Sequence, residues 1–115
     1  MIFIGYKKCS TCKRISKQMD EKNISYKYRE IDKDNPSREE LEFWYQKSGL
    51  DIKKFFNTSG KVYRENNLKD KLKTMDLDEK LDLLSKDGML VKRPILLDGD
   101  KIFVGNQVEK YIESF

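Results

Sequence analysis

The chain has 115 residues, 37% hydrophobic and 38% charged, which predicts one domain with a single core and a heavily charged surface. The net charge is +4, but basic and acidic residues are interleaved along nearly the whole chain, which argues against direct nucleic-acid binding. No apolar run approaches the roughly 18 to 20 residues of a membrane span, and no signal peptide is present, so we expect a cytoplasmic protein without a membrane partner.

Residues 2–31 have the pattern of a strand, a helix and a second strand. The apolar run 2–4, bounded by Gly5, predicts a buried strand, and alternating residues over 24–31 predict the second one. A helix that ends near Asn23 is indicated by apolar residues at helical intervals, namely Cys12, Ile15 and Met19. This order predicts a βαβ unit with parallel strands, whose helix is capped by Ser10 or Thr11.

The middle of the chain is predicted to be helical. Ser37 and Glu40 form a capping box at the start of one helix, and Gly49 is its stop signal. After this helix, helical patterns cover 52–56, 68–75 and 78–86, with a turn at 57–60 and Gly88 as the last stop signal. We therefore expect an all-helical insertion over about residues 35–88.

Strand patterns return near the C-terminus. Residues 95–97 and 101–104 flank Asp98-Gly99-Asp100, a strong hairpin signal, and Asn106 resembles the capped start of a last helix. The resulting order is β-α-β, a helical insertion, then β-β-α. We therefore predict a single α/β domain over residues 1–115 with a thioredoxin-like fold, in which a mixed β-sheet is flanked by helices and a helical sub-domain is inserted.

Both cysteines lie in one Cys9-Ser10-Thr11-Cys12 unit directly after the first predicted strand, and this position indicates a redox motif. Cysteines three residues apart reach each other across one helical turn, so Cys12 can resolve a mixed disulfide formed on Cys9. The helix N-terminus and the nearby basic residues favour an anion at Cys9. We predict Cys9 as the nucleophile, with a lowered pKa, and Cys12 as the resolving cysteine.

Three other interpretations of the pair stay open on the sequence alone. A structural disulfide would close a very short loop and suits a different compartment. A metal site would need carboxylates to complete it, because the chain has two cysteines and no histidine. Two cysteines that merely pack in the core would also fit this spacing.

Arg93 and Pro94 precede the third predicted strand, where a missing N–H is tolerable. Most X–Pro bonds in folded proteins are trans, and most arginines are surface charges. Taken alone, these two residues therefore predict a trans proline beside an exposed arginine.

Three segments together resemble the arsenate reductase (ArsC)/Spx family of thioredoxin-fold proteins, in an order and spacing that cover nearly the whole chain. They are 6–14 (YKKCSTCKR), 55–60 (FFNTSG) and 90–97 (LVKRPILL). The resemblance implies that the Arg93–Pro94 bond is cis, that Pro94 packs beside the reactive cysteine and that Arg93 faces its thiol. We expect Ser10 and Thr11 close to the same thiol.

The arsenate reductases of this family use one cysteine with a small-thiol reductant and cradle the oxyanion with three arginines. Arg93 matches one of them, whereas Asn57 and Gly105 stand where the other two are expected. Each lost charge-assisted bond is worth about 1.5–3 kcal/mol, so arsenate reduction is the least favoured function for this chain.

The Spx branch implies a different use of the same cysteines. Its members carry a Cys-x-x-Cys redox switch and bind the C-terminal domain of the RNA polymerase α subunit. Cys9, Cys12 and Arg93 match this branch. Ser59 stands where those regulators carry an arginine, and the chain ends at Phe115, before the extra C-terminal segment that they share.

We therefore predict a thiol–disulfide oxidoreductase whose catalytic residues are Cys9, Cys12 and Arg93, with a redox-sensing transcription regulator as the alternative. No bound cofactor and no metal are expected. An external thiol reductant, either glutathione or a thioredoxin/glutaredoxin system, would recycle the pair. The expected partner is a thiol or disulfide substrate, with the RNA polymerase α subunit as the partner in the regulator interpretation, and we expect a monomer.

Overall fold

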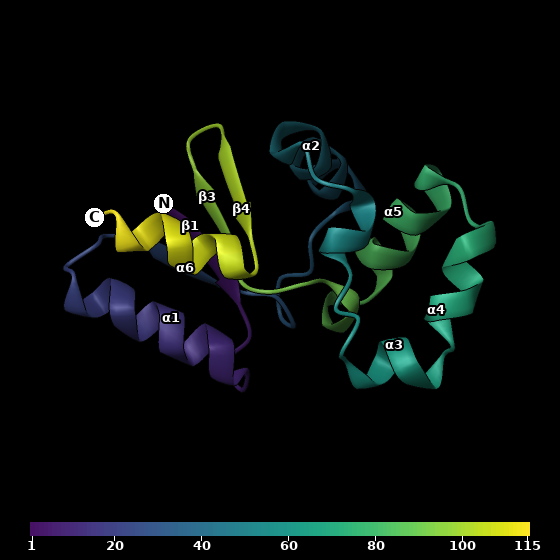
Figure 1. Ribbon diagram of the computed structural model, residues 1–115, viewed down its shortest axis with the longest axis horizontal. Helices are drawn as coiled ribbons and strands as arrows, with labels where there is room; N and C mark the ends of the chain where they lie inside the picture. Colours follow the sequence, from purple (N-terminus) through teal and green to yellow (C-terminus); the bar gives the residue numbers. More distant parts are fainter. The chain divides into compact units, whose positions relative to one another are not determined.

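A computed structural model describes residues 1–115, whose contacts divide the chain into two compact units (Figure 1). The sheet unit consists of Met1–Asp34 and Arg93–Phe115, and the helical unit consists of Asn35–Lys92. No helix in either unit combines the length and the apolar character that crossing a membrane requires.

The sheet unit is built on a four-stranded sheet with the order β2-β1-β3-β4. The strands are β1 (Ile2–Gly5), β2 (Lys27–Glu30), β3 (Ile95–Asp98) and β4 (Lys101–Val104). β1 pairs parallel with β2 and antiparallel with β3, and β3 pairs antiparallel with β4. The predicted parallel βαβ unit and the predicted C-terminal hairpin, with Gly99 in the left-handed conformation at φ 60°, are both confirmed.

One boundary prediction is wrong. The second strand begins at Lys27, whereas the alternating pattern predicts a start at Ile24. Asn23 takes a positive φ of 58°, and the N–H of Ile24 donates to the carbonyl of Met19 at 3.0 Å. Ile24 therefore closes the end of the preceding helix, and its N–H is not free for a sheet ladder.

Helices α1 (Ser10–Glu21) and α6 (Asn106–Glu113) lie side by side on one face of the sheet (Figure 1). The strand register places Phe3 directly opposite both Tyr28 and Leu96. Phe3 and Leu96 pack in one buried cluster with the apolar residues of the two helices, which are Cys12, Ile15, Met19, Val108 and Ile112. The mixed sheet flanked by helices, as expected for a thioredoxin-like fold, is confirmed.

The N-terminal caps of these two helices differ from the sequence prediction. Cys9 itself is the N-cap of α1, and neither Ser10 nor Thr11 takes that place, because both are already helical. Asn106 is likewise the first residue of α6, and Gly105 is its N-cap. The side chain of the next residue, Gln107, makes the hydrogen bond at this helix start, because its Oε1 accepts from the N–H of Val104 at 3.1 Å.

The helical unit contains only helices and turns apart from one isolated bridge between Phe56 and Val91. Its elements are α2 (Arg38–Ser48), η1 (Ile52–Phe55), α3 (Lys61–Glu65), α4 (Leu68–Lys71), η2 (Leu72–Thr74), α5 (Leu77–Lys86) and η3 (Gly88–Leu90). The capping box of Ser37 and Glu40 and the left-handed Gly49 are confirmed. Helix α3 is not predicted by the sequence. The predicted helix over 78–86 is confirmed as α5, and Gly88, its predicted stop signal, begins the 3₁₀ turn that follows.

Candidate thiol site

The two cysteines lie at the N-terminal end of α1, directly after β1. Cys9 is half-buried at the N-cap position, whereas Cys12 is fully buried in the core of the sheet unit. The backbone of Tyr6 holds both residues, because its carbonyl accepts the N–H of Cys9 at 3.0 Å and its N–H donates to Cys12 Sγ at 3.5 Å. Both side chains are free thiols. One cysteine is therefore partly accessible, whereas the other is enclosed in the core.

Cys9 is favoured as a thiolate. Burial is the largest single influence and acts to raise the pKa of Cys9. The backbone N–H of Cys12, the Cys12 thiol, the backbone N–H of Thr11 and the charge of Arg93 together outweigh burial, so the pKa of Cys9 lies below its ordinary value. The N–H groups at the start of α1 thus support a negative charge on the sulfur, although the Cys9 side chain closes no cap hydrogen bond as a thiol.

Cys12 has the opposite preference. Burial, the largest influence, raises the pKa of Cys12 to about 12, and the hydrogen bond and charge of Cys9 act in the same direction. The backbone N–H of Tyr6 and the charge of Arg93 oppose this shift without cancelling it. The pKa values of the two thiols are therefore shifted in opposite directions, that of Cys9 downwards and that of Cys12 upwards.

The Arg93–Pro94 peptide bond is cis, as the family resemblance implies, and the trans bond favoured by base rates is not found. Pro94 is buried, and its carbonyl accepts the N–H of Gly105 at 2.8 Å. The guanidinium of Arg93 lies 5.2 Å from the centre of the Tyr6 ring, and its charge lowers the pKa of both cysteines. Arg93 thus acts electrostatically on both sulfurs from the segment that enters β3.

Ser10 and Thr11 contribute backbone to the site. Ser10 is exposed and Thr11 is partly buried, and neither side chain caps α1. The N–H of Thr11 is one of the groups that lower the pKa of Cys9. Of these two residues, only Thr11 is seen to act on the thiol, and it does so through its backbone; the role of Ser10 stays a prediction.

Gly105 and Asn57 stand where the resemblance to arsenate reductases leads us to expect arginine, and each is fixed by its own backbone conformation or hydrogen bonds. Gly105 has φ 61° and ψ −126°, a backbone conformation that is essentially restricted to glycine, so an arginine does not fit this backbone. Asn57 lies in the helical unit, where its N–H donates to the carbonyl of Leu90 at 2.7 Å and its side-chain oxygen accepts from the Ser59 hydroxyl at 3.4 Å.

Tyr6 is a site residue to which the sequence analysis assigns no role. Its backbone binds both cysteines and its ring lies against Arg93. Its position could have indicated this role. Tyr6 directly follows Gly5, which ends the strand, and precedes Cys9 by three residues, so it lies in the connection between the strand and the helix. Backbone contacts of this kind do not depend on residue type, so composition could not reveal them.

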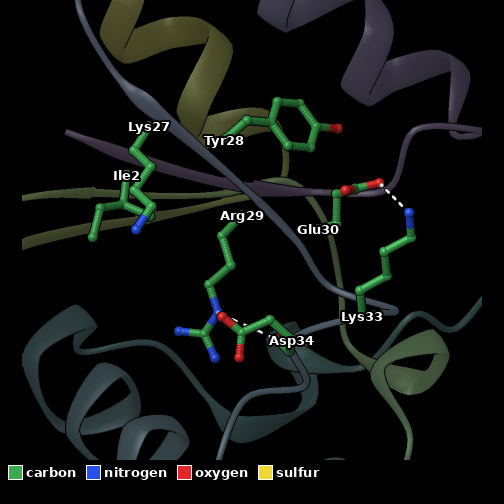
Figure 2. Close-up of a pocket in the computed structure, with 7 residues that line it drawn as sticks. All are labelled: Ile2, Lys27, Tyr28, Arg29, Glu30, Lys33 and Asp34. Atoms are coloured by element: carbon green, nitrogen blue, oxygen red, sulfur yellow. Dashed lines mark hydrogen bonds and ion pairs between the residues drawn. The ribbon is translucent and has the colours of Figure 1, made fainter.

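The rest of the sheet unit offers no metal site, and it has a hollow at the edge of its sheet. The structure brings together no group of three or more histidine, cysteine or acidic side chains that could hold a metal ion. Figure 2 shows a hollow of about 350 Å³ at the edge strand β2, where Tyr28 and Arg29 point to opposite sides of the strand. Four of its charged groups pair with one another, Arg29 with Asp34 at 3.2 Å and Lys33 with Glu30 at 3.7 Å.

Comparison with known proteins gives one consistent picture. A model of the ArsC family matches residues 4–114. The uncharacterized protein YusI of Bacillus subtilis (strain 168) is 48% identical over 115 residues, which are 100% of this chain and 98% of YusI. The regulatory protein MgsR of the same strain is 27% identical over 105 residues, which are 91% of this chain and 82% of MgsR.

Two solved structures share the whole fold. One, from Bacteroides fragilis, is described as ArsC family related. It has a TM-score of 0.91 and 46% identity, and the match covers 97% of this chain and 94% of that one. The other, from Streptococcus mutans UA159, is described as a possible arsenate reductase. It has a TM-score of 0.88 and 43% identity, and the match covers 99% of this chain and 97% of that one.

Proposed function

The chain belongs to the ArsC family, and we propose that it is a thiol–disulfide oxidoreductase that works through Cys9 and Cys12. The observation that carries the proposal is the opposite protonation preference of two neighbouring sulfurs. Cys9 is half-exposed with a lowered pKa, and Cys12 is buried with a pKa of about 12. A nucleophile and a resolving thiol need these two properties.

In the first step the thiolate of Cys9 attacks one sulfur of a substrate disulfide. The substrate S–S bond breaks, a mixed disulfide forms on Cys9, and the departing substrate thiolate takes a proton from solvent. The positive charge of Arg93 and the N–H groups of Thr11 and Cys12 support the attacking anion before the bond forms.

In the second step Cys12 must lose its proton. Two of the influences that raise the pKa of Cys12 are the hydrogen bond and the negative charge of Cys9. Both depend on a free Cys9 sulfur, so forming the mixed disulfide lowers the pKa of Cys12 at the moment when its thiolate is needed. The Cys12 thiolate then attacks Cys9 Sγ and releases the second substrate thiolate, which is protonated.

The substrate has then gained two electrons, and Cys9 and Cys12 are joined in a disulfide. An external thiol reductant, such as glutathione or a thioredoxin/glutaredoxin system, must reduce this bond before another turnover. The buried position of Cys12 supports an order in which the recycling thiol attacks the exposed sulfur of Cys9 first.

The test is the rate of Cys9 alkylation by iodoacetamide as a function of pH, followed by peptide mass mapping. We expect a midpoint below the ordinary value of about 8.5 for a free cysteine. The variant Cys12→Ser should accumulate a stable mixed disulfide with a model substrate, whereas Cys9→Ser should form none. An ordinary midpoint together with no Cys9–Cys12 disulfide under mild oxidant would contradict the proposal.

The similarity to MgsR favours a second candidate, a redox-gated regulator in which the same disulfide controls a protein contact. Its partner would be the C-terminal domain of the RNA polymerase α subunit. A pull-down with that domain, with the cysteines reduced and then oxidised, separates the two functions. Binding in only one redox state supports the regulator, and no binding in either state removes it.

A further inference from the structure

We propose that a groove beside Cys9 selects polypeptide substrates that carry acidic residues close to the reacting disulfide. The lysine groove is a hollow of about 370 Å³ in the sheet unit, formed by Lys7, Lys13, Lys17, Asp20, Tyr26 and Tyr28. This inference names the substrate class of the proposed oxidoreductase and therefore rests on that function.

The lysine groove lies one helical turn beyond the reactive cysteine. Lys13 follows Cys9 by one helical turn, and its N–H donates to the Cys9 carbonyl at 3.0 Å. Lys17 follows one turn later, so Cys9, Lys13 and Lys17 share one stripe of α1. The buried residues of this helix, Cys12, Ile15 and Met19, occupy a different stripe that faces the core.

Two tyrosines form the opposite wall. Tyr28 projects from β2 on the side away from Arg29 (Figure 2) and packs against Phe3, with ring centres 5.2 Å apart. The charges of Cys12 and Cys9 both act on the Tyr28 hydroxyl, which places this ring within electrostatic range of the reacting sulfurs. The groove thus runs along α1, between the helix on one side and Tyr26 and Tyr28 on the other.

The charges of the groove are not balanced. Asp20 is its only carboxylate, and it already accepts a hydrogen bond from Tyr26 at 2.8 Å. Lys7 lies over the Tyr28 ring, with Nζ 3.8 Å from its centre. Lys13 and Lys17 take part in no ion pair, whereas the neighbouring Arg14 is paired with Glu109. Lys13 and Lys17 are therefore available to carboxylates of a bound partner.

The spacing of these lysines sets the register of the acidic residues. With a helical rise of about 1.5 Å per residue, Lys13 lies about 6 Å and Lys17 about 12 Å along the axis from Cys9. An extended peptide advances about 3.3 Å per residue, so these lysines would meet acidic side chains about two and four positions from the substrate cysteine. Both carboxylates of glutathione, a tripeptide, belong to residues that directly adjoin its cysteine, short of the four positions that correspond to Lys17. The geometry therefore favours a polypeptide over a small thiol.

The test uses single-turnover reactions of the full chain with short peptides whose one cysteine is linked to 5-thio-2-nitrobenzoate. Attack of the Cys9 thiolate on the peptide sulfur breaks this disulfide and releases the coloured nitrobenzoate thiolate, which is followed by absorbance. One peptide series has glutamate two and four positions from the cysteine, on either side of it, and its matched series has glutamine there. Glutathione linked to the same group is the small-thiol comparison.

We expect the glutamate peptides to react faster than the glutamine peptides by about twofold to fivefold for each lysine engaged, and this ratio to fall towards one in 0.5 M NaCl. Lys13→Gln and Lys17→Gln should each lower this ratio. Lys17→Gln should also slow the reaction of the glutamate peptides more than it slows the reaction of the glutathione derivative. The control Lys110→Gln removes the same charge from an exposed position of α6 and should leave the ratio unchanged.

Each possible outcome decides between the claims. Equal rates for glutamate and glutamine peptides, or the same loss in Lys110→Gln as in Lys17→Gln, would overturn the substrate preference and leave the oxidoreductase function standing. If wild-type protein releases no nitrobenzoate from either peptide series while Cys9→Ser behaves identically, the oxidoreductase function itself fails.

Discussion

The helical unit and the surroundings of Cys9 in the sheet unit differ in how their charged side chains are paired. In the helical unit Arg38 pairs with Glu42 of its own helix and with Asp78 and Asp82, which joins α2 to α5. In the sheet unit, Lys13 and Lys17 face solvent beside the thiol without carboxylate partners, and Arg93 acts on both sulfurs. The charges of Arg38 connect two helices, whereas those around Cys9 leave a positive field beside the thiol.

The residues of the candidate thiol site all come from the sheet unit. Tyr6, Cys9, Cys12, Arg93 and Pro94 all belong to this unit, and so does the core cluster that encloses Cys12. A disturbance of that core should therefore change both folding stability and thiol chemistry. A matched disturbance in the core of the helical unit should lower folding stability and leave the thiol chemistry unchanged. The predictions below test this difference.

The largest effect is expected from truncating an aromatic residue in each core. Phe3→Ala in the sheet unit and Phe55→Ala in the helical unit both empty a site that is 0% exposed, so each should lower the free energy of unfolding by about 3–5 kcal/mol. Phe3 shares its cluster with Cys12, so only Phe3→Ala should also change the pH midpoint of cysteine alkylation.

Urea unfolding gives the stability of both variants, and iodoacetamide kinetics give the thiol midpoint under conditions where each is folded. If Phe55→Ala moves the alkylation midpoint as far as Phe3→Ala does, the thiol site is not a property of the sheet unit alone.

Much of the sheet unit could be predicted from sequence because its signals are local. The apolar run before Gly5, the Asp98-Gly99-Asp100 turn and the Cys9–Cys12 spacing each depend on a few adjacent residues. The cis state of the Arg93–Pro94 bond, in contrast, has no local signal in the sequence. Base rates favour trans, and only the family resemblance predicts the observed geometry.

The missed features depend on contacts between residues that are distant in sequence or on backbone atoms. Cys9 replaces Ser10 or Thr11 as the N-cap because the chain leaves β1 through Tyr6, whose carbonyl binds the Cys9 N–H. Helix α3 has only five residues and no side-chain cap, so it carries too little periodicity to be recognised. Tyr6 acts on the two cysteines largely through its backbone N–H and carbonyl, and the identity of a side chain does not reveal backbone hydrogen bonds.

A second prediction concerns the buried thiol of the sheet unit. The pKa of Cys12 is raised from 9.0 to about 12, so between these values the folded protein holds a proton that the unfolded chain has lost. The contribution of this group to stability is therefore complete below about pH 9 and is lost as the pH rises through about 12. The stability difference between wild-type protein and Cys12→Ala should shrink as the pH increases from 8 towards this range.

Urea unfolding in reducing buffer at several pH values measures that difference. Leu84→Ala in the helical unit is the control, because it removes a fully buried side chain that does not titrate. Its stability difference from wild type should not depend on pH. A Cys12→Ala difference that is equally flat would show that Cys12 is not a strongly perturbed thiol.

A third prediction compares one glycine from each unit. A Cβ on Gly5 would lie 2.7 Å from Phe3 Cε1 and 2.7 Å from the Tyr28 hydroxyl, and Phe3 is fully buried. Gly5→Ala should therefore lower the free energy of unfolding by about 1–3 kcal/mol. A Cβ on Gly60 would lie 2.6 Å from Nδ2 of Asn57, the end of a side chain that can rotate, so Gly60→Ala should cost less.

Denaturation midpoints of both variants, measured side by side, give the comparison. An equal or larger loss for Gly60→Ala would mean that the turn of the helical unit is packed as rigidly as the sheet.

The smallest effect is expected at a helix end. Lys22 Nζ donates to three carbonyls at the C-terminus of α6, those of Ile112 at 3.0 Å and of Glu113 and Phe115 at 3.3 Å each. Lys22→Met keeps the apolar stem and removes the charge, so it should lower the free energy of unfolding by about 0.3–1 kcal/mol at low salt.

Lys86→Met, in the last turn of α5, is the matched change in the helical unit and should have a smaller effect, because Lys86 makes no such set of carbonyl contacts. Urea unfolding in 0.05 M and 1 M NaCl separates the two contributions, since the charge effect at Lys22 is screened by salt while lost packing is not. A loss at Lys22 that does not change with salt would mean that its stem, rather than its ammonium group, joins α1 to α6.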